Sequence, residues 1–229
     1  THDIDAISQY RHLRGALGGL RRGEGKAVWA ALRDIHQDPL YTFPWILEQD
    51  RQVKKAEPIY FVKRTRGRGY DYPQYCLHGH DWRRLKHMLR HNNVYLGVHG
   101  SYYGSIPAIE YSKMYRAHYL RCSIEQLQRL ADAGYTDDFT MGFADQAGFR
   151  LQTCRAVRWI NPKTMQLTNL TLHPLIVMDT TLSKYMHLTE DEAYFLCERL
   201  IAKVKLHHGD LCLLWHNNKC LLQHPLVQT

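Results

Sequence analysis

Short apolar runs that end on an acidic residue or a histidine recur along this chain, and they limit what it can fold into. Residues 94–98 lead into His99, and the run Leu211-Cys212-Leu213-Leu214-Trp215 leads into His216. Two carboxylates, Asp3 and Asp5, stand at the very start. In parallel α/β folds, the carboxyl ends of the strands meet at one edge and carry the reactive side chains. The pattern therefore predicts a site built from Asp and His at the ends of several strands.

Helical signals alternate with these strand-like runs. Residues 81–91 show helical spacing of apolar side chains and lie between two strand-like stretches, 59–62 and 94–98. Capping boxes at 123–126 and 189–192 mark the starts of two further helices. An order of strand, helix and strand predicts parallel βα units and therefore an α/β fold. We also expect helices at 27–35 and 43–52, and strands at 114–120, 156–160, 175–178 and 211–215.

Length and composition are those of a folded domain. The chain has 229 residues, 45% of them hydrophobic, so we expect one domain that spans 1–229. Its apolar runs are all shorter than the roughly 18–20 residues of a membrane span. The first residue is Thr1 rather than Met, and no strand precedes Asp3 in the sequence. We therefore expect a truncated start, with an upstream segment that supplied the strand or a whole domain.

The charge balance is basic. The net charge is +8, from 30 Lys and Arg against 22 Asp and Glu, which favours anionic partners such as acidic glycans. The most basic stretch is Lys63-Arg64-Thr65-Arg66-Gly67-Arg68, either a solvated loop or one that binds a phosphate or uronate. No nucleic-acid-binding motif is present, so we do not expect a nucleic-acid partner. The six cysteines have no C-x-x-C spacing, so no disulfide framework or cysteine zinc site is expected.

Four stretches have to be considered together: Thr1-His2-Asp3-Ile4-Asp5, Gly97-Val98-His99-Gly100-Ser101-Tyr102, Arg116-Ala117-His118-Tyr119-Leu120 and Leu214-Trp215-His216-Asn217. In this order and spacing they resemble the polysaccharide deacetylase family, also called carbohydrate esterase family four or the NodB-homology domain. The closer resemblance is to a bacterial branch in which this domain follows an N-terminal domain of unknown function. The family implies a distorted (β/α) barrel of seven strands, one divalent metal ion, usually Zn²⁺, and hydrolysis of acetyl groups on glycans.

The resemblance implies a metal site with one displaced ligand. Asp3 corresponds to the catalytic base and Asp5 to a metal ligand. The family's second motif has two histidines four residues apart, whereas here His99 is followed by Tyr103. Its third motif is usually Arg-Pro-Pro-Tyr, and here His118 stands in place of a proline. We therefore expect Asp5, His99 and His118 to bind the metal ion, although His118 could instead orient another ligand.

Further residues take roles from the same resemblance. Arg116 would pair with Asp3 and orient it. His216, from the last motif, would be the general acid or a third ligand. Tyr119 would bind substrate, with its backbone N–H forming part of an oxyanion hole. Arg150 and Asp179 would line the substrate groove or form an ion pair.

The implied function is a metal-dependent hydrolase that removes N- or O-linked acetyl groups from a bacterial polysaccharide or cell-envelope glycan. Two departures from the family keep alternatives open. Position 103 lacks the usual histidine, and residues 104–115 are too few for the helix that the family usually has there. One alternative is a catalytically weak or inactive relative that binds a glycan or a protein partner. The other is a metal-dependent phosphoesterase or nucleic-acid binder.

Overall fold

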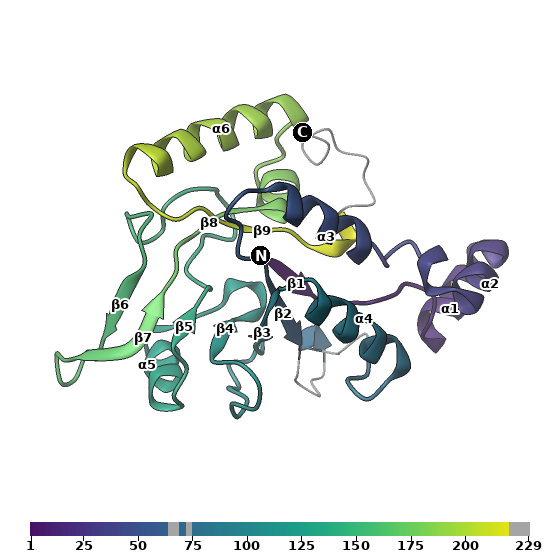
Figure 1. Cartoon of the computed structure of the whole chain (residues 1–229), viewed down its shortest axis with the longest axis horizontal. Helices are drawn as coiled ribbons and strands as arrows, with labels where there is room; N and C mark the ends of the chain where they lie inside the picture. The colour runs from purple at the N-terminus through teal and green to yellow at the C-terminus, as the bar shows by residue number, and fades with distance from the viewer. Residues whose placement is uncertain (64–68, 72–74, 220–229) are drawn as a thin grey trace.

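A computed structural model describes residues 1–63, 69–71 and 75–219 of the chain. Within them, seven strands form one sheet in the order β1-β2-β3-β4-β5-β7-β6, and β8 pairs with β9 (Figure 1). Neighbouring strands are parallel except for β6, which is antiparallel to β7. The strands are β1 (His2–Ile4), β2 (Ile59–Lys63), β3 (Tyr95–His99), β4 (Met114–Arg116), β5 (Asp137–Asp138), β6 (Val157–Ile160), β7 (Leu167–Leu172), β8 (Leu175–Met178) and β9 (Cys212–Leu214).

The helices follow the expected alternation with strands. Helix α3 leads into β2, and α4 joins β2 to β3, so the predicted α/β fold with parallel βα units is confirmed. None of the helices in the described residues combines the length and the hydropathy of a membrane span. The helices are α1 (Leu13–Arg21), α2 (Gly25–Arg33), α3 (Phe43–Gln52), α4 (His80–His91), α5 (Ile124–Asp132) and α6 (Glu190–Leu206).

Backbone hydrogen bonds connect the β8–β9 pair to both sides of the larger sheet. The N–H of Trp215, just after β9, donates to the carbonyl of Thr1, just before β1, at 3.0 Å. The N–H of Leu175 in β8 donates to the carbonyl of Met141, after β5, at 3.1 Å. The last strands of the chain therefore lie beside the first one.

One face of the sheet carries the residues that later form the site. Strand register aligns Asp3 with Phe61 and Phe61 with Gly97. A Cβ at Gly97 would lie 2.5 Å from the Phe61 ring, so glycine leaves room for that ring. Because side chains alternate along a strand, Lys63 and His99 at the ends of β2 and β3 share the face of Phe61.

The opposite face of β1 and β2 packs against helices. Ile4, Tyr60 and Val62 form an apolar cluster with Ile46 of α3 and Leu85 of α4, and all five are 2% exposed or less. Every residue of β2 is buried, as expected of a parallel strand covered on both faces. This core fixes the strand ends in which the site lies.

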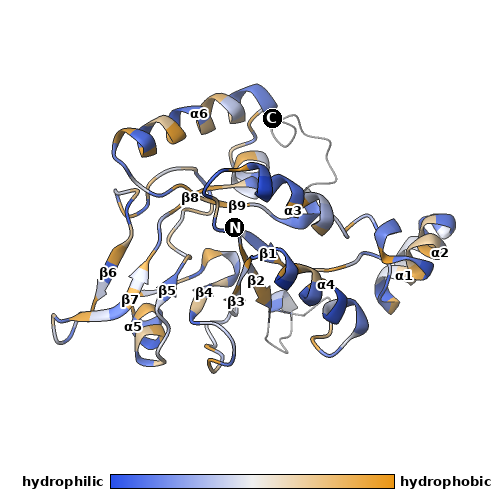
Figure 2. Cartoon of the chain, in the orientation of Figure 1, coloured by the Kyte–Doolittle hydropathy of each residue, from blue (hydrophilic) through white to orange (hydrophobic). Residues whose placement is uncertain are grey.

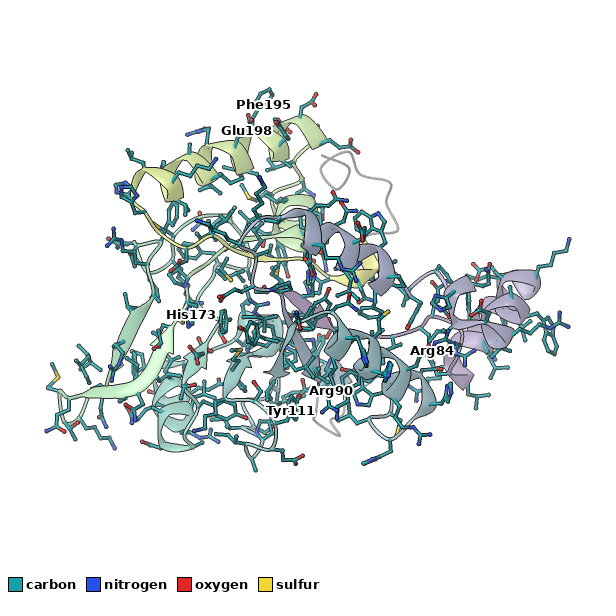
Figure 3. The ribbon with its side chains drawn as sticks, viewed as in Figure 1. Arg84, Arg90, Tyr111, His173, Phe195 and Glu198 are labelled. Atoms are coloured by element: carbon teal, nitrogen blue, oxygen red, sulfur yellow. The ribbon has the colours of Figure 1, made fainter. Side chains whose placement is uncertain are left out.

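Helix α6 covers the β8–β9 side of the molecule with one face. Hydrophobic and hydrophilic residues alternate along it in Figure 2. Leu200 and Val204 pack with Ile176 of β8, whereas Phe195 and Glu198 point away from the protein (Figure 3). The Thr189 hydroxyl and the Glu192 carboxylate form the predicted capping box at its start, which confirms that helix boundary.

Three strands of the sheet were not expected from the sequence. Asp3 lies within β1 and Asp5 directly follows it, so the strand that we expected upstream lies inside the chain. Strand β5 has two residues and lies between the predicted helix after 123–126 and the strand expected at 156–160, where we expected no strand. Strand β7 pairs with β5 and β6 and has alternating burial near its end.

The strand expected at 114–120 is shorter than predicted. β4 ends at Arg116, and a 3₁₀ turn, His118–Leu120, follows it. Tyr119 and Leu120 have φ of +57° and +53°, in the left-handed region that L-residues seldom adopt. The turn reverses the chain at the sheet edge, and His118 is buried there.

The predicted lack of a helix between β3 and β4 is confirmed, because residues 100–113 contain none. Ile106 and Ile109 of this connection instead pack against a cluster that includes Tyr115 and Leu130. The loop thus supplies part of the apolar cover that a helix would give.

Candidate active site

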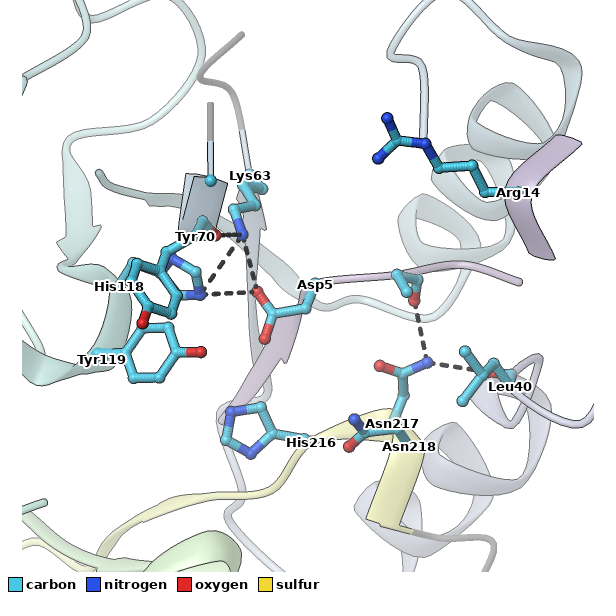
Figure 4. Close-up of a pocket in the computed structure, with 12 residues that line it drawn as sticks. Asp5, Arg14, Leu40, Lys63, Tyr70, His118, Tyr119, His216, Asn217 and Asn218 are labelled. Carbon is cyan, nitrogen blue, oxygen red and sulfur yellow. Dashed lines mark hydrogen bonds and ion pairs between the residues drawn. The ribbon is translucent and has the colours of Figure 1, made fainter. Parts of the chain in front are cut away.

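The candidate site lies at the carboxyl ends of the first four strands. Asp5 follows β1, and Lys63, His99 and Arg116 are the last residues of β2, β3 and β4. His118 follows in the 3₁₀ turn. A pocket opens over this edge, and Figure 4 shows its lining, which includes Asp5, Lys63, Tyr70, His118, Tyr119 and His216.

Asp5, His99 and His118 form a cluster that could hold a metal ion, with ligand atoms all within 4.8 Å of one another. The Nε2 atoms of both histidines lie 3.5 Å from Oδ1 of Asp5. Ligand atoms about 2.1 Å from a tetrahedral Zn²⁺ are about 3.4 Å apart, so these separations fit. Oδ1 of Asp5 is buried and accepts no hydrogen bond from the described residues. The donor set therefore suits a divalent ion.

Both histidines present Nε2 because Nδ1 is engaged. Nδ1 of His99 lies 3.2 Å from the carbonyl oxygen of Arg116, which can only accept a hydrogen bond. Nδ1 of His118 lies 3.2 Å from the carboxylate of Asp71. Asp71 is itself held by the Ser101 hydroxyl and by the N–H of Tyr102. Such acceptors behind a histidine are typical of metal sites.

The two imidazoles differ in basicity. Burial, together with the charge of His99, lowers the pKa of His118 to about 4, so its ring is neutral at pH 7. Burial also lowers the pKa of His99, but Asp3 and Asp5 outweigh this and raise it. For Asp5, burial raises the pKa, yet His99, His216 and Lys63 hold it below its usual range.

Arg116 pairs with Asp3 in the interior. Its Nη1 atom donates to Oδ1 of Asp3 at 3.0 Å, and its Nε atom donates to the carbonyl of Phe139 at 3.1 Å. The guanidinium also stacks on the Phe61 ring, 4.3 Å from its centre. Burial raises the pKa of Asp3, but His99 and Arg116 outweigh burial and keep it below its usual value. The second carboxylate oxygen, Oδ2, lies 3.6 Å from Nε2 of His99.

Lys63 is a site residue that we did not predict. It is 3% exposed, and its Nζ atom lies 3.5 Å from Oδ1 of Asp5 and 3.4 Å from Nε2 of His118. It donates to the carbonyl of Tyr70 at 3.1 Å (Figure 4). We assigned Lys63 to the basic stretch, whose positions 64–68 lie outside the described residues. Its place at the end of a fully apolar strand was the signal that it is buried.

His216 and Asp179 form a second pair at the pocket. Nδ1 of His216 lies 2.7 Å from Oδ1 of Asp179, and the His216 N–H donates to Oδ2 at 2.7 Å. Burial lowers the pKa of His216, but Asp179 raises it more, to about 9. Asp179 is 4% exposed and also accepts from Thr180. Its geometry therefore favours orienting His216 over the substrate contact that we expected.

The other two expected substrate residues lie in different pockets. Tyr119 is half exposed and lines the same pocket as Asp5 and His118. Arg150 lines a neighbouring pocket and donates to the carbonyl of Gly142 at 3.0 Å. It forms no ion pair with Asp179, because the Asp179 carboxylate pairs with His216.

The fold of the chain is similar to that of a proposed polysaccharide deacetylase from Mycobacterium smegmatis. That crystal structure aligns with a TM-score of 0.56 at 14% identity, over 99% of this chain and 81% of that chain. A proposed polysaccharide deacetylase involved in O-antigen biosynthesis from Bordetella bronchiseptica aligns with a TM-score of 0.43 at 12% identity, over 78% of this chain and 65% of that chain, and we infer nothing from it. No family model and no curated protein sequence matches the chain. The chain therefore has the fold of polysaccharide deacetylases, as its sequence implied.

Proposed function

We propose that this protein is a metal-dependent hydrolase that removes N- or O-linked acetyl groups from a bacterial polysaccharide or cell-envelope glycan. The observation that carries the proposal is the buried Oδ1 atom of Asp5, which accepts no hydrogen bond from the described residues and faces Nε2 of His99 and His118. One carboxylate and two imidazoles are a common ligand set for catalytic Zn²⁺. The fold similarity to the Mycobacterium smegmatis protein adds support.

Asp3 is the general base of this proposal. An ion held by Asp5, His99 and His118 would polarise the acetyl carbonyl and make a nearby water more acidic. Oδ1 of Asp3 accepts from Arg116, which leaves Oδ2 to take a proton from that water. Because the pKa of Asp3 is below its usual value, its carboxylate is ionised at neutral pH.

His216 is the general acid. With its pKa raised to about 9, chiefly by Asp179 acting against burial, the imidazole is protonated at pH 7. It lines the pocket and can give its proton to the leaving amine or alkoxide. Asp179 holds the ring through Nδ1, so Nε2 is the nitrogen that would donate.

Metal content and acetate release together test the proposal. Purified wild type, His99→Ala and His118→Ala should be assayed for bound zinc by elemental analysis and for acetate released from acetylated glycans. We expect one zinc ion per chain in the wild type and loss of zinc and activity in both variants, because each removes one of three ligands. The matched control is His78→Ala, which removes an exposed histidine.

The outcomes separate the roles within the site. Zinc that is lost only in His99→Ala would mean that His118 orients a ligand rather than binding the ion. Wild-type protein that binds no divalent ion and releases no acetate would contradict the hydrolase proposal.

A catalytically weak glycan-binding relative is the second candidate, and Lys63 favours it. Its ammonium lies 3.5 Å from the same Asp5 oxygen that would bind the metal ion. Zinc binding only at high concentration, with glycan binding retained, would favour this candidate.

A further inference from the structure

A second pocket lies beside the candidate active site, and arginines dominate its charge. Arg121, Arg129 and Arg150 line it, and we call it the arginine pocket; Glu125 is the acidic residue in its described lining. Arg121 follows the 3₁₀ turn, Arg129 is on α5, and Arg150 lies in the connection after β5. No described carboxylate lies within ion-pair distance of these guanidinium groups. The described lining therefore carries a net positive charge.

Two of the arginines are held in place by contacts that leave donors available. The guanidinium of Arg121 stacks over the Tyr102 ring, 4.3 Å from its centre. Stacking fixes the plane of the group and leaves its N–H edges open. Arg150 uses Nη1 to donate to the carbonyl of Gly142. A planar, preorganised guanidinium is suited to bidentate binding of a carboxylate or phosphate.

Three tyrosines connect this pocket to the candidate active site. Tyr70 and Tyr119 line the first pocket and Tyr102 lines the arginine pocket. The ring of Tyr70 lies 4.6 Å from that of Tyr102 and 5.5 Å from that of Tyr119, between ring centres. Tyr70 and Tyr119 are 56% and 51% exposed, so their apolar ring surfaces are open to a ligand. Exposed aromatic rings with a polar edge suit amphipathic ligands such as sugar rings.

The 3₁₀ turn after β4 and the residue that follows it line both pockets. His118 and Tyr119 line the first pocket, and Leu120 and Arg121 line the arginine pocket. A glycan that places one sugar over His118 therefore has Arg121 within reach of a neighbouring sugar.

We propose that the arginine pocket binds an oxyanion substituent, a carboxylate or a phosphate, on a sugar next to the one whose acetyl group enters the candidate active site. The substrate class is then an acidic acetylated glycan that lies over the three tyrosines between the two pockets. The net charge of +8 agrees with an anionic ligand. Deacetylation of such a glycan rests on the proposed function, whereas its binding in the arginine pocket does not.

Calorimetric titration of unacetylated oligogalacturonate into the purified chain tests the binding step without catalysis. The wild type binds this oligomer, and the Arg121→Gln/Arg129→Gln variant loses about tenfold or more in affinity, because charge-assisted hydrogen bonds are lost. The matched control is Arg83→Gln/Arg90→Gln, which removes two exposed charges from α4 (Arg90 is labelled in Figure 3). Its affinity stays within about twofold, because distant surface charges are screened.

Two further ligands identify the substituent. The methyl ester of the same oligogalacturonate is neutral and binds about tenfold or more weakly. The affinity of a phosphorylated oligomannoside shows whether the pocket also accepts phosphate. Of the two anionic ligands, the one that binds more tightly identifies the substituent that the pocket prefers. Equal affinity for the acid and its methyl ester, or an equal loss in the two double variants, would overturn the proposal.

Turnover separates this inference from the proposed function. On acetylated oligogalacturonate, the Arg121→Gln/Arg129→Gln variant should raise KM and leave kcat unchanged, because the arginines do not touch the reacting group. A protein that binds the acidic oligomer through the arginines but releases no acetate contradicts the proposed function alone. A protein that deacetylates acidic and neutral oligomers with equal kcat/KM contradicts this inference alone.

Discussion

Oδ1 of Asp5 has three nitrogen atoms around it, at 3.5 Å each, from Lys63, His99 and His118. In the neutral form of each imidazole, Nδ1 donates to its acceptor and Nε2 keeps a lone pair for a metal ion. The ammonium of Lys63 has no lone pair to offer and carries a positive charge. At the scale of single residues, the site therefore combines a set of ligands with a charge that opposes a cation.

The sequence predicted Asp3, Asp5, His99, Arg116 and His118, and the structure brings these residues together. Each lies in a short motif whose residue types have a chemical role. Lys63 could not be found in that way, because a lysine followed by three arginines within five residues is most simply a surface residue. Its place at the end of an apolar strand was the one sequence signal, and the strand register, which puts Lys63 on the face of Phe61, shows that it points inward.

Replacement of Lys63 should strengthen metal binding. Lys63→Met keeps most of the buried chain and removes the charge, so we expect the zinc Kd to fall about tenfold or more. The measurement is competition with a chelating dye at constant pH. Lys26→Met removes an exposed charge from α2 and is the control. An unchanged or higher Kd for Lys63→Met would show that Lys63 holds Asp5 and His118 in place.

Asp138 should make the stability of the protein depend on pH. Burial raises its pKa to about 6, although hydrogen bonds from Thr140 oppose this. Because the folded-state pKa exceeds the unfolded one of about 4, its protonated form stabilises the fold below pH 4, and up to about 3 kcal/mol is lost as pH rises to 6. Urea unfolding from pH 4 to 7 should show Asp138→Asn gaining stability relative to wild type.

Asp137 is the matched control because its shift has the opposite sign. The hydrogen bond from His173, followed by smaller effects, holds the pKa of Asp137 below its usual value. Its contribution is present above the unfolded pKa and is lost as the pH falls. Asp137→Asn should therefore lose stability relative to wild type at pH 7, and the same sign for both variants would contradict the assignment.

At the scale of elements, helices were predicted better than strands. The range 43–52 coincides with α3, and the capping boxes at 123–126 and 189–192 mark the starts of α5 and α6, because caps and helical periodicity are local signals. Strand β5 was missed because two residues carry no periodicity, and its pairing depends on β4 and β7. The 3₁₀ turn after β4 was missed because Tyr119 adopts a positive φ that its residue type does not predict.

The capping box of α6 gives a test at this scale. Thr189→Ala removes the hydroxyl that accepts from the N–H of Glu192, and we expect the melting temperature to fall by about 2–4 °C. The measurement is thermal unfolding followed by circular dichroism. Thr189→Ser keeps the hydroxyl and should melt within about 1 °C of wild type. An equal loss in both variants would show that packing of the threonine methyl group matters instead.

At the scale of the whole molecule, residues far apart in the sequence converge on the site. Nδ2 of Asn217 donates to the carbonyls of Ala6 and Leu40, at 3.0 and 2.9 Å. The hydroxyl of Thr42 donates to the carbonyl of Asn217 at 2.9 Å. The segment after β9 is thus fastened to the segments that follow β1 and precede α3. No local sequence pattern indicates this contact, because its partners are not defined until the sheet has formed.

Removal of this contact should destabilise the protein. Asn217→Ala leaves one buried and one partly buried carbonyl without their donor, and we expect the free energy of unfolding to fall by about 2 kcal/mol. Urea denaturation measures it. The control is Asn218→Ala, which changes an exposed neighbour and should stay within about 0.5 kcal/mol of wild type. Equal losses in the two variants would contradict a structural role for Asn217.

The hydrogen bond between Trp215 and Thr1 affects the order in which the protein folds during synthesis. The proposed ligand Asp5 follows the first strand, and that strand is bordered on one side by the segment after β9. A chain that emerges from the ribosome with its N-terminus first cannot form this edge until Trp215 has been synthesised. Until then β1 remains an edge strand, open to pairing with another chain. If the proposed site binds zinc, its uptake should follow synthesis of Trp215 and can serve as a late reporter of folding.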